Sequence, residues 1–167
     1  MKNNSGFSLI EMLVVVMIFS VLTILATQSL ATSLRGTRKS ESVGNVRENI
    51  EFAMSIMERS LRSAKDLDCD SSSSSKLVYK TPSNVEARFE CSGVNIASAS
   101  GASSVLLINN SDVEIMGCGG ATSFVCNKGL GGKPDSVEIR VTAQDVENRG
   151  IESAMYTSQT KILLRNY

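Results

Sequence analysis

An uninterrupted apolar segment near the N-terminus constrains this chain more than any other feature. Residues 7–26 read FSLIEMLVVVMIFSVLTILA, with a single charged side chain, Glu11. As a helix rising ~1.5 Å per residue, such a segment spans the ~30 Å hydrocarbon core of a bilayer. A secretory signal peptide has a shorter apolar region, about 7–15 residues, although Ser29-Leu30-Ala31 could serve as its cleavage site. The sequence therefore predicts a membrane-spanning helix over residues 7–31.

Glu11 is the informative residue of this segment. A carboxylate at the centre of a bilayer costs on the order of 2.5–3.5 kcal/mol, so intramembrane acids are functional candidates. Geometry alone leaves two interpretations open. Either Glu11 pairs with a cation inside the membrane, or it lies near the membrane edge and reaches back to water.

The residues Gly6-Phe7-Ser8-Leu9-Ile10-Glu11, preceded by a short polar leader that contains Lys2, resemble the processing site of type IV prepilins and type II secretion pseudopilins. The resemblance implies that a prepilin peptidase removes residues 1–6 by cutting between Gly6 and Phe7, and methylates the new amine of Phe7. It also implies that Glu11 attracts the N-terminal amine of a neighbouring subunit during assembly. An amine and a carboxylate attract strongly in a low dielectric, where each alone is costly.

The same resemblance implies partners and a location. The partners are the prepilin peptidase, other pilin or pseudopilin subunits, an inner-membrane assembly platform and the lipid bilayer. The protein would cross the inner (cytoplasmic) membrane once, with its C-terminal head extracytoplasmic, and then enter a pilus or pseudopilus. Arg35, Arg38 and Lys39 flank the far end of the span, so the positive-inside rule does not by itself select this orientation. The cleavage motif and the cysteines take precedence over that rule.

Four cysteines, Cys69, Cys91, Cys118 and Cys126, all follow the apolar segment. Two disulfides in an oxidising compartment are expected; the alternatives are four reduced thiols or a zinc site, whose usual close cysteine pairs are missing. Four cysteines allow three connectivities. We predict the pairs Cys69–Cys91 and Cys118–Cys126, because closing the shorter loops costs the least chain entropy.

The composition gives little support for an enzyme or a nucleic-acid-binding protein. The chain has no histidine, and its 17 basic residues equal its 17 acidic residues. Histidine is the commonest general base near neutral pH, and a basic, aromatic-rich patch that would bind nucleic acid is not evident. We expect no catalytic residue, no cofactor and no clear nucleic-acid site.

Two short motifs are incomplete ligand sites. Asp66, Asp68 and Asp70 alternate like the first ligands of a calcium loop, but Ser71 and Leu77 stand where that loop needs a glycine and an acid. The segment Gly129–Lys133 resembles a phosphate loop, but Pro134 follows where a hydroxyl is needed. We therefore interpret the acids as solvated, the glycine segment as a turn, and expect no metal site.

A helix is predicted to continue over residues 32–66. Apolar residues recur there at intervals of three and four, which predicts one buried stripe on an amphipathic helix; they are Val43, Val46, Ile50, Ala53, Met57, Leu61 and Ala64. A coiled coil is the alternative, but the stripe is short and a head domain follows. The serine run Ser71–Ser75 is predicted to end the helix as a loop or hinge.

Residues 67–167 are predicted to form a globular, β-rich head. The hydrophobic period changes to two in several segments, which is typical of half-buried strands. The expected strands are Leu77–Tyr79, Val85–Cys91, Val105–Ile108, Val137–Thr142 and Tyr156–Leu164. The predicted fold class is α+β, a long N-terminal helix packed on a mainly antiparallel sheet, which is also the fold that the pilin resemblance implies.

These observations favour a structural subunit of a filament over two alternatives, a membrane-anchored extracytoplasmic binding domain and an enzyme. Within the filament hypothesis, residues 46–64 and the tail Thr160–Asn166 are similar to minor pilins and minor pseudopilins. That similarity implies a subunit that primes assembly or sits at the tip. A pseudopilin of a type II secretion system and a subunit of a DNA-uptake filament remain alternatives.

Overall fold

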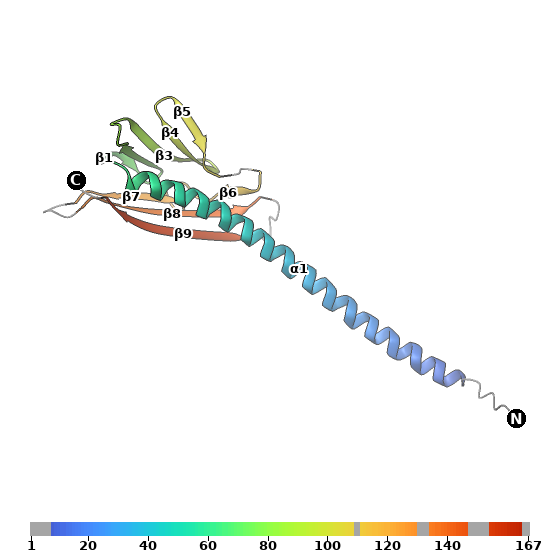
Figure 1. Ribbon diagram of the computed structural model, residues 1–167. Helices are drawn as coiled ribbons and strands as arrows, with labels where there is room; N and C mark the ends of the chain where they lie inside the picture. The colour runs from blue at the N-terminus through green and yellow to red at the C-terminus, as the bar shows by residue number, and fades with distance from the viewer. Residues whose placement is uncertain (1–7, 109–110, 130–133, 147–153, 165–167) are drawn as a thin grey trace. The chain divides into compact units, whose positions relative to one another are not determined.

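The computed structural model describes residues 8–108, 111–129, 134–146 and 154–164 (Figure 1). Two compact units make up the chain, Met1–Ser40 and Glu41–Tyr167. One long helix runs through the first unit and continues into the second, and nine strands follow it among the described residues of the second unit.

Helix α1 extends from Leu9 to Arg62. Its first turn is closed by the carbonyl of Ser8, which accepts hydrogen bonds from the backbone amides of Glu11 and Met12 at 3.0 and 3.3 Å. No proline interrupts it, so every internal amide can donate along the helix. The helix ends when the Lys65 amide donates to the carbonyl of Lys80 at 2.9 Å, which directs the chain into the first strand.

The first sheet is an antiparallel meander whose five strands follow one another in chain order. Its strands are β1 (Asp66–Ser73), β2 (Lys76–Lys80), β3 (Glu86–Ser92), β4 (Asn95–Ser100) and β5 (Ser103–Leu106). Short turns suffice because each strand pairs with the next. Gly93 and Gly101 lie in two of these turns with φ of 61° and 58°, a conformation that glycine adopts without a steric penalty.

The second sheet is organised around one long strand, β8 (Ser136–Asp145). Strand β9 (Met155–Leu163) pairs with residues 136–144 of β8 along one edge. The other edge is shared by β6 (Val113–Ile115), which pairs with residues 143–145, and β7 (Ser123–Asn127), which pairs with residues 136–140. All of these pairings are antiparallel.

Between β6 and β7, the side chains of two threonines form hydrogen bonds at the edge of β8. The Thr142 amide of β8 donates to the Thr122 hydroxyl at 3.0 Å, and that hydroxyl donates to the Thr142 carbonyl at 3.1 Å. The Thr142 hydroxyl donates in turn to the Ala121 carbonyl at 2.9 Å. Thr122 is fully buried, so unpaired backbone groups would otherwise be costly at this point.

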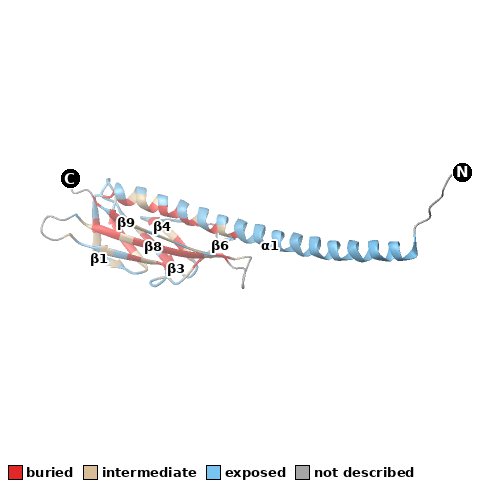
Figure 2. Cartoon of the chain, turned by 90° about the horizontal axis from the view of Figure 1, so that it is seen from below, coloured by how far each residue is buried: buried red, intermediate tan, exposed pale blue. Residues whose placement is uncertain are grey.

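One hydrophobic core joins α1 to both sheets of the head. The helix contributes a stripe that is completely buried: Val46, Ile50, Ala53, Met57 and Leu61. On the first sheet Tyr79 and Phe89 stack at 5.2 Å between ring centroids; on the second, the inward side chains include Val137, Ile139 and Val141. Figure 2 shows this core in red on the strands and on the helix within Glu41–Arg62. The predicted α+β fold, one long helix packed on antiparallel sheets, is confirmed.

The serine run does not act as a loop or hinge, so that prediction is wrong. Ser71–Ser73 belong to β1, and only Ser74 and Ser75 form the turn to β2. The register of β1 against β2 shifts between Asp68 and Ser73, and the Ser72 hydroxyl bridges the shift. It accepts from the Val78 amide at 2.9 Å and donates to the Asp68 carbonyl at 2.6 Å. Serine hydroxyls thus take over bonds that the strand backbone cannot make.

All five predicted strands are present, with small differences in the residues at which they begin and end. The segment expected at Val105–Ile108 is β5, which ends at Leu106, while Leu107 and Ile108 are buried beyond it. The strands that the sequence did not predict are β1, β4, β6 and β7. Of the glycine segment interpreted as a turn, residues 130–133 lie outside the described residues.

The buried stripe of α1 should be essential for stability. Ile50→Ala removes a side chain with 0% exposure and should lower the free energy of unfolding by about 2–5 kcal/mol. Phe52→Ala, on the same helix but with the side chain 60% exposed, should change it by less than about 0.5–1 kcal/mol. Denaturant unfolding of the two variants measures the difference. Equal losses would contradict the observed orientation of the helix.

Candidate assembly helix and the disulfide-linked head

The first unit presents an apolar helix surface with no cover. Leu9, Met17 and Phe19 expose 79%, 70% and 70% of their surface. Within α1 an 18-residue window reaches a mean hydropathy of 2.7, and none of that window is buried. Its length and composition allow it to cross a membrane. Apolar surface of this extent needs lipid or other apolar helices to cover it.

Three hydroxyl groups of this helix are hydrogen-bonded to carbonyls of the same helix. Ser20 donates to the Met17 carbonyl at 2.8 Å, Thr23 to the Phe19 carbonyl at 2.8 Å, and Thr27 to the Thr23 carbonyl at 2.7 Å. An unsatisfied polar group in hydrocarbon costs several kcal/mol. These bonds allow the three hydroxyl groups to enter lipid without bound water.

Glu11 lies in the first turn of α1 and is exposed. A carboxylate at this end of a helix is favoured by the helix dipole. Within the described part of the chain, no basic side chain forms an ion pair with it. Gly6 and Phe7, the predicted processing site, lie outside the described residues. The assembly role of Glu11 stays a prediction.

The head contains two disulfides, as expected, but the predicted pairing is wrong. Cys69 is bonded to Cys126, and Cys91 to Cys118. Their Cα atoms are 5.4 and 5.5 Å apart, within the usual range for a disulfide.

Strand order explains the correction. Strand β2 lies between β1, which carries Cys69, and β3, which carries Cys91. Strands two positions apart in a sheet are separated by about 9–10 Å, which exceeds the ~7 Å limit between Cα atoms of a disulfide. Cys118 forms an isolated β-bridge with Thr122, and the chain continues from Thr122 through β7 to Cys126. Packing of the two sheets, and not proximity in sequence, therefore selects the partners.

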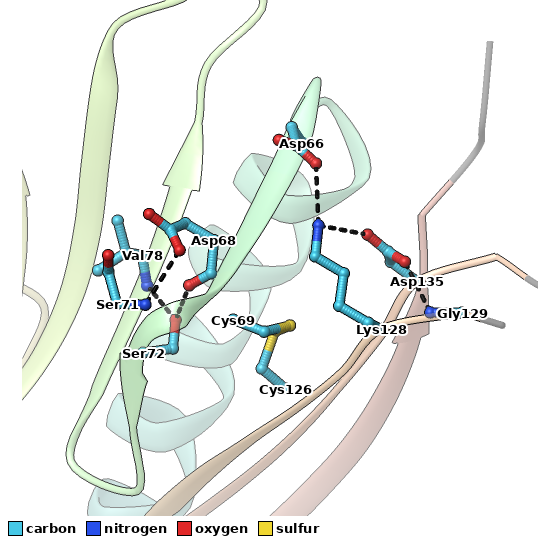
Figure 3. The surroundings of a disulfide bond; sticks show 10 residues. All are labelled: Asp66, Asp68, Cys69, Ser71, Ser72, Val78, Cys126, Lys128, Gly129 and Asp135. Carbon is cyan, nitrogen blue, oxygen red and sulfur yellow. Dashed lines mark hydrogen bonds and ion pairs between the residues drawn. A yellow bond between two sulfur atoms is a disulfide. The ribbon is translucent and has the colours of Figure 1, made fainter.

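Both disulfides join the first sheet to the β6–β7 side of the second. Two backbone hydrogen bonds follow the same seam: the Phe124 amide donates to the Ser74 carbonyl at 3.0 Å, and the Ile115 amide to the Val94 carbonyl at 2.8 Å. Figure 3 shows Cys69 of β1 facing Cys126 of β7, with Lys128 beside them. The seam is thus closed by covalent, hydrogen-bonded and ionic contacts.

Lys128 links the starts of two strands. Its Nζ lies 3.5 Å from Asp66 at the start of β1 and 3.5 Å from Asp135, next to β8 (Figure 3). Desolvation acts to lower the pKa of Lys128, but attraction to the two carboxylates outweighs it and the pKa is raised. Asp135 also accepts a hydrogen bond from the Gly129 amide at 2.7 Å.

The alternating acids of the incomplete calcium motif take part in strand contacts. Asp66 pairs with Lys128, while the Asp68 carboxylate accepts the Ser71 amide at 3.0 Å, and hydrogen bonds from Ser71 lower the pKa of Asp68. Among the described residues, no cluster of three or more histidine, cysteine, aspartate or glutamate side chains could hold a metal ion. Asp66 and Asp68 of this motif therefore take part in contacts within the head.

Comparison with protein families bears on the first unit. A family model described as the prokaryotic N-terminal methylation motif matches residues 1–27. The chain carries a prepilin N-terminal methylation motif. The matched residues include Gly6, Phe7 and Glu11 together with most of the apolar segment. Comparisons with curated proteins and with solved structures found no match.

This motif supports a type IV pilin-like or pseudopilin subunit. Proteins with the motif are structural and not enzymatic, and the motif implies processing by prepilin peptidase and assembly with other pilin subunits. The exposed apolar helix that begins within the matched residues fits a membrane-anchored pilin. The match ends at residue 27, so the head is characterised by its structure alone.

The disulfide pairing can be tested directly. Digestion without reduction should yield peptides that link Cys69 to Cys126 and Cys91 to Cys118; a peptide linking Cys69 to Cys91 would contradict the structure. The sequence separations are 57 and 27 residues, so the double variants Cys69→Ala/Cys126→Ala and Cys91→Ala/Cys118→Ala should lose about 4 and 3.5 kcal/mol of stability. Unfolding of the reduced wild-type protein provides the control.

Proposed function

We propose that this chain is a subunit of a type IV pilus or related pseudopilus, anchored in the inner membrane until it is assembled. The observation that carries the proposal is that the residues matched by the methylation motif, 1–27, include the start of an apolar helix whose side chains are exposed. Removal of residues 1–6 leaves this helix on the mature chain. The helix then serves as a membrane anchor before assembly and packs against apolar helices of other subunits afterwards.

Two features support an extracytoplasmic head. Prepilin peptidase acts on the cytoplasmic side, so a motif at the N-terminus leaves the opposite end of the span outside. The two disulfides of the head form and persist in oxidising compartments. By the positive-inside rule, Arg35, Arg38 and Lys39 would favour the opposite orientation. The two features together outweigh that preference and set this single-pass orientation.

We assign four parts to the chain: a leader at residues 1–6, a membrane and assembly helix at 7–31, an amphipathic part at 32–66, in which the helix ends at Arg62, and a head at 67–167. The compact second unit begins at Glu41, and the amphipathic part from Val46 to Leu61 is buried in the core of the head. This supports an amphipathic part that belongs to the head and an apolar part that is left for membrane and filament contacts.

Glu11 is proposed to set the position of an incoming subunit. After cleavage the new amine of Phe7 is a cation at the edge of the apolar segment, and Glu11 is the only acid within residues 1–40. Pairing of this carboxylate with a neighbour's amine neutralises two charges that would otherwise be costly in a low dielectric. Apolar helices could slide past one another freely, and this pair would fix their register.

We further propose a minor subunit that primes assembly or sits at the filament tip. The support is the similarity of residues 46–64 and Thr160–Asn166 to minor pilins and minor pseudopilins. Quantitative mass spectrometry of sheared filaments measures the abundance of the chain relative to the main subunit. A few copies per filament are expected, and an abundance equal to that of the main subunit would contradict the assignment.

Processing is tested with Gly6→Asp. This change should leave the leader attached, because a side chain is introduced next to the bond that the peptidase cuts. Intact-mass measurement of membrane-extracted protein should give a mature, methylated N-terminus at Phe7 in the wild type and an uncleaved chain in the variant. Cleavage after Ala31, or an intact leader in the wild type, would overturn the prepilin assignment.

The role of Glu11 is tested with Glu11→Gln, which removes the charge and keeps the size of the side chain. Loss of one partner of a buried ion pair costs about 3–5 kcal/mol, so recovery in sheared filaments should fall at least tenfold while membrane levels stay normal. Glu48→Ala, an exposed glutamate elsewhere on α1, is the control and should assemble normally. Normal recovery of Glu11→Gln would remove Glu11 from the assembly mechanism.

A further inference from the structure

Three basic residues gather on one side of the helix just beyond the apolar segment. They are Arg35, Arg38 and Lys39, which we call the basic collar. Their spacing, i, i+3 and i+4, makes them neighbours on a helix surface. All three are exposed and lie within the first unit, Met1–Ser40.

The charges of the collar are not neutralised by ion pairs in the described part of the chain, although Glu41 follows Arg38 by three residues on α1. None of its three side chains forms an ion pair there. Two other basic residues of α1 do form such pairs, Arg47 with Glu51 at 2.6 Å and Arg62 with Glu58 at 3.2 Å. Like charges at this spacing repel each other and weaken a helix. A bound anion would relieve that repulsion.

The position of the collar along the helix agrees with the thickness of a bilayer. Arg35 follows Glu11 by 24 residues, which corresponds to about 36 Å of helix. The hydrocarbon core is ~30 Å thick, and the bilayer with its headgroups ~40–45 Å. With Glu11 at one boundary of the hydrocarbon, Arg35 therefore lies in the opposite headgroup layer. Leu30 and Leu34, directly before it, are 62% and 56% exposed apolar residues that suit the edge of the hydrocarbon.

We propose that the basic collar binds the phosphate groups of anionic phospholipids in the extracytoplasmic leaflet. An arginine fork matches phosphate oxygens in a bidentate geometry, and long basic side chains can reach from a helix end to the headgroups. The site is continuous with the proposed membrane span, which favours lipid as the occupant over a second copy of the chain. The inference rests on the proposed membrane anchoring.

The distribution of charge supports this assignment. The first unit has four basic residues and one acidic residue, and the second has 13 basic and 16 acidic residues. An acidic head is repelled by an anionic surface, so attraction to that surface is concentrated in the collar. The bound lipids would hold the subunit in the membrane, and its transfer into a filament would require their release.

The test uses the full chain in nanodiscs that contain equal amounts of phosphatidylglycerol and phosphatidylethanolamine. Native mass spectrometry counts the lipids that each protein retains. The collar variant is Arg35→Gln/Arg38→Gln/Lys39→Gln. It is compared with wild type and with a control that has the same change of charge, Arg59→Gln/Arg62→Gln/Lys65→Gln. Each basic residue near an anionic membrane surface contributes about a fivefold gain in attachment. We expect at least a tenfold preference of wild type and control for phosphatidylglycerol, and its loss in the collar variant.

Several outcomes would overturn the inference: equal preference in the collar variant and wild type, an equal loss in the control, or displacement of the lipid by 10 mM inorganic phosphate. A crosslinked pair of chains whose formation requires the collar, without any lipid preference, would assign the collar to a second copy. Vesicle flotation separates this inference from the proposed function. A chain that inserts into vesicles without a lipid preference contradicts only the collar, whereas a chain that fails to insert contradicts the membrane anchor itself.

Discussion

The head depends on the burial of one stripe of α1 in a core that both sheets share. Ile50, Met57 and Leu61 are completely buried, and residues beside this stripe contact both sheets. Ser60 hydrogen-bonds with Tyr79 of β2 in the first sheet, and burial raises the pKa of Tyr79. In the second sheet, Asp145 of β8 accepts a hydrogen bond from Ser42, and the guanidinium carbon of Arg47 lies 5.8 Å from the ring centre of Tyr156 of β9. Without the helix, each sheet would expose its apolar face to water.

The two parts of α1 have different surroundings. Within the head its polar residues face water and its apolar stripe faces protein, the usual amphipathic arrangement. Between Met12 and Ala26 it carries no charged side chain, its apolar side chains are exposed, and the hydroxyl groups of Ser20 and Thr23 are bonded to carbonyls of the same helix. That arrangement is suited to lipid and, without change, to the apolar interior of a filament. The methylation motif at residues 1–27 gives this otherwise uncovered surface its functional meaning.

The sequence was informative where a hydrophobic period or a short chemical motif is self-contained. The intervals of three and four from Val46 to Leu61 predicted the buried face of α1, and the alternation of apolar and polar residues predicted β3 and β8. Strands β1 and β4, DLDCDSSS and NIASAS, have few apolar residues, so pairing with neighbouring strands determines them and local sequence does not. The disulfide partners depend on strand order for the same reason. The processing site and the role of Glu11 were inferred from the motif, whereas the structure was needed to see that the collar side chains form no ion pair among the described residues.

The disulfides are nested, because the loop closed by Cys91 and Cys118 lies inside the loop closed by Cys69 and Cys126. When the chain is pulled from its ends, tension passes directly through the outer sulfur–sulfur bond. The 57 residues by which its cysteines are separated are thereby withheld from extension, which removes about 200 Å of contour length. Two side-by-side loops, as sequence neighbours would have formed, would leave the segment between them free to extend. The observed connectivity therefore limits the length to which the head can be extended, even after its sheets have separated.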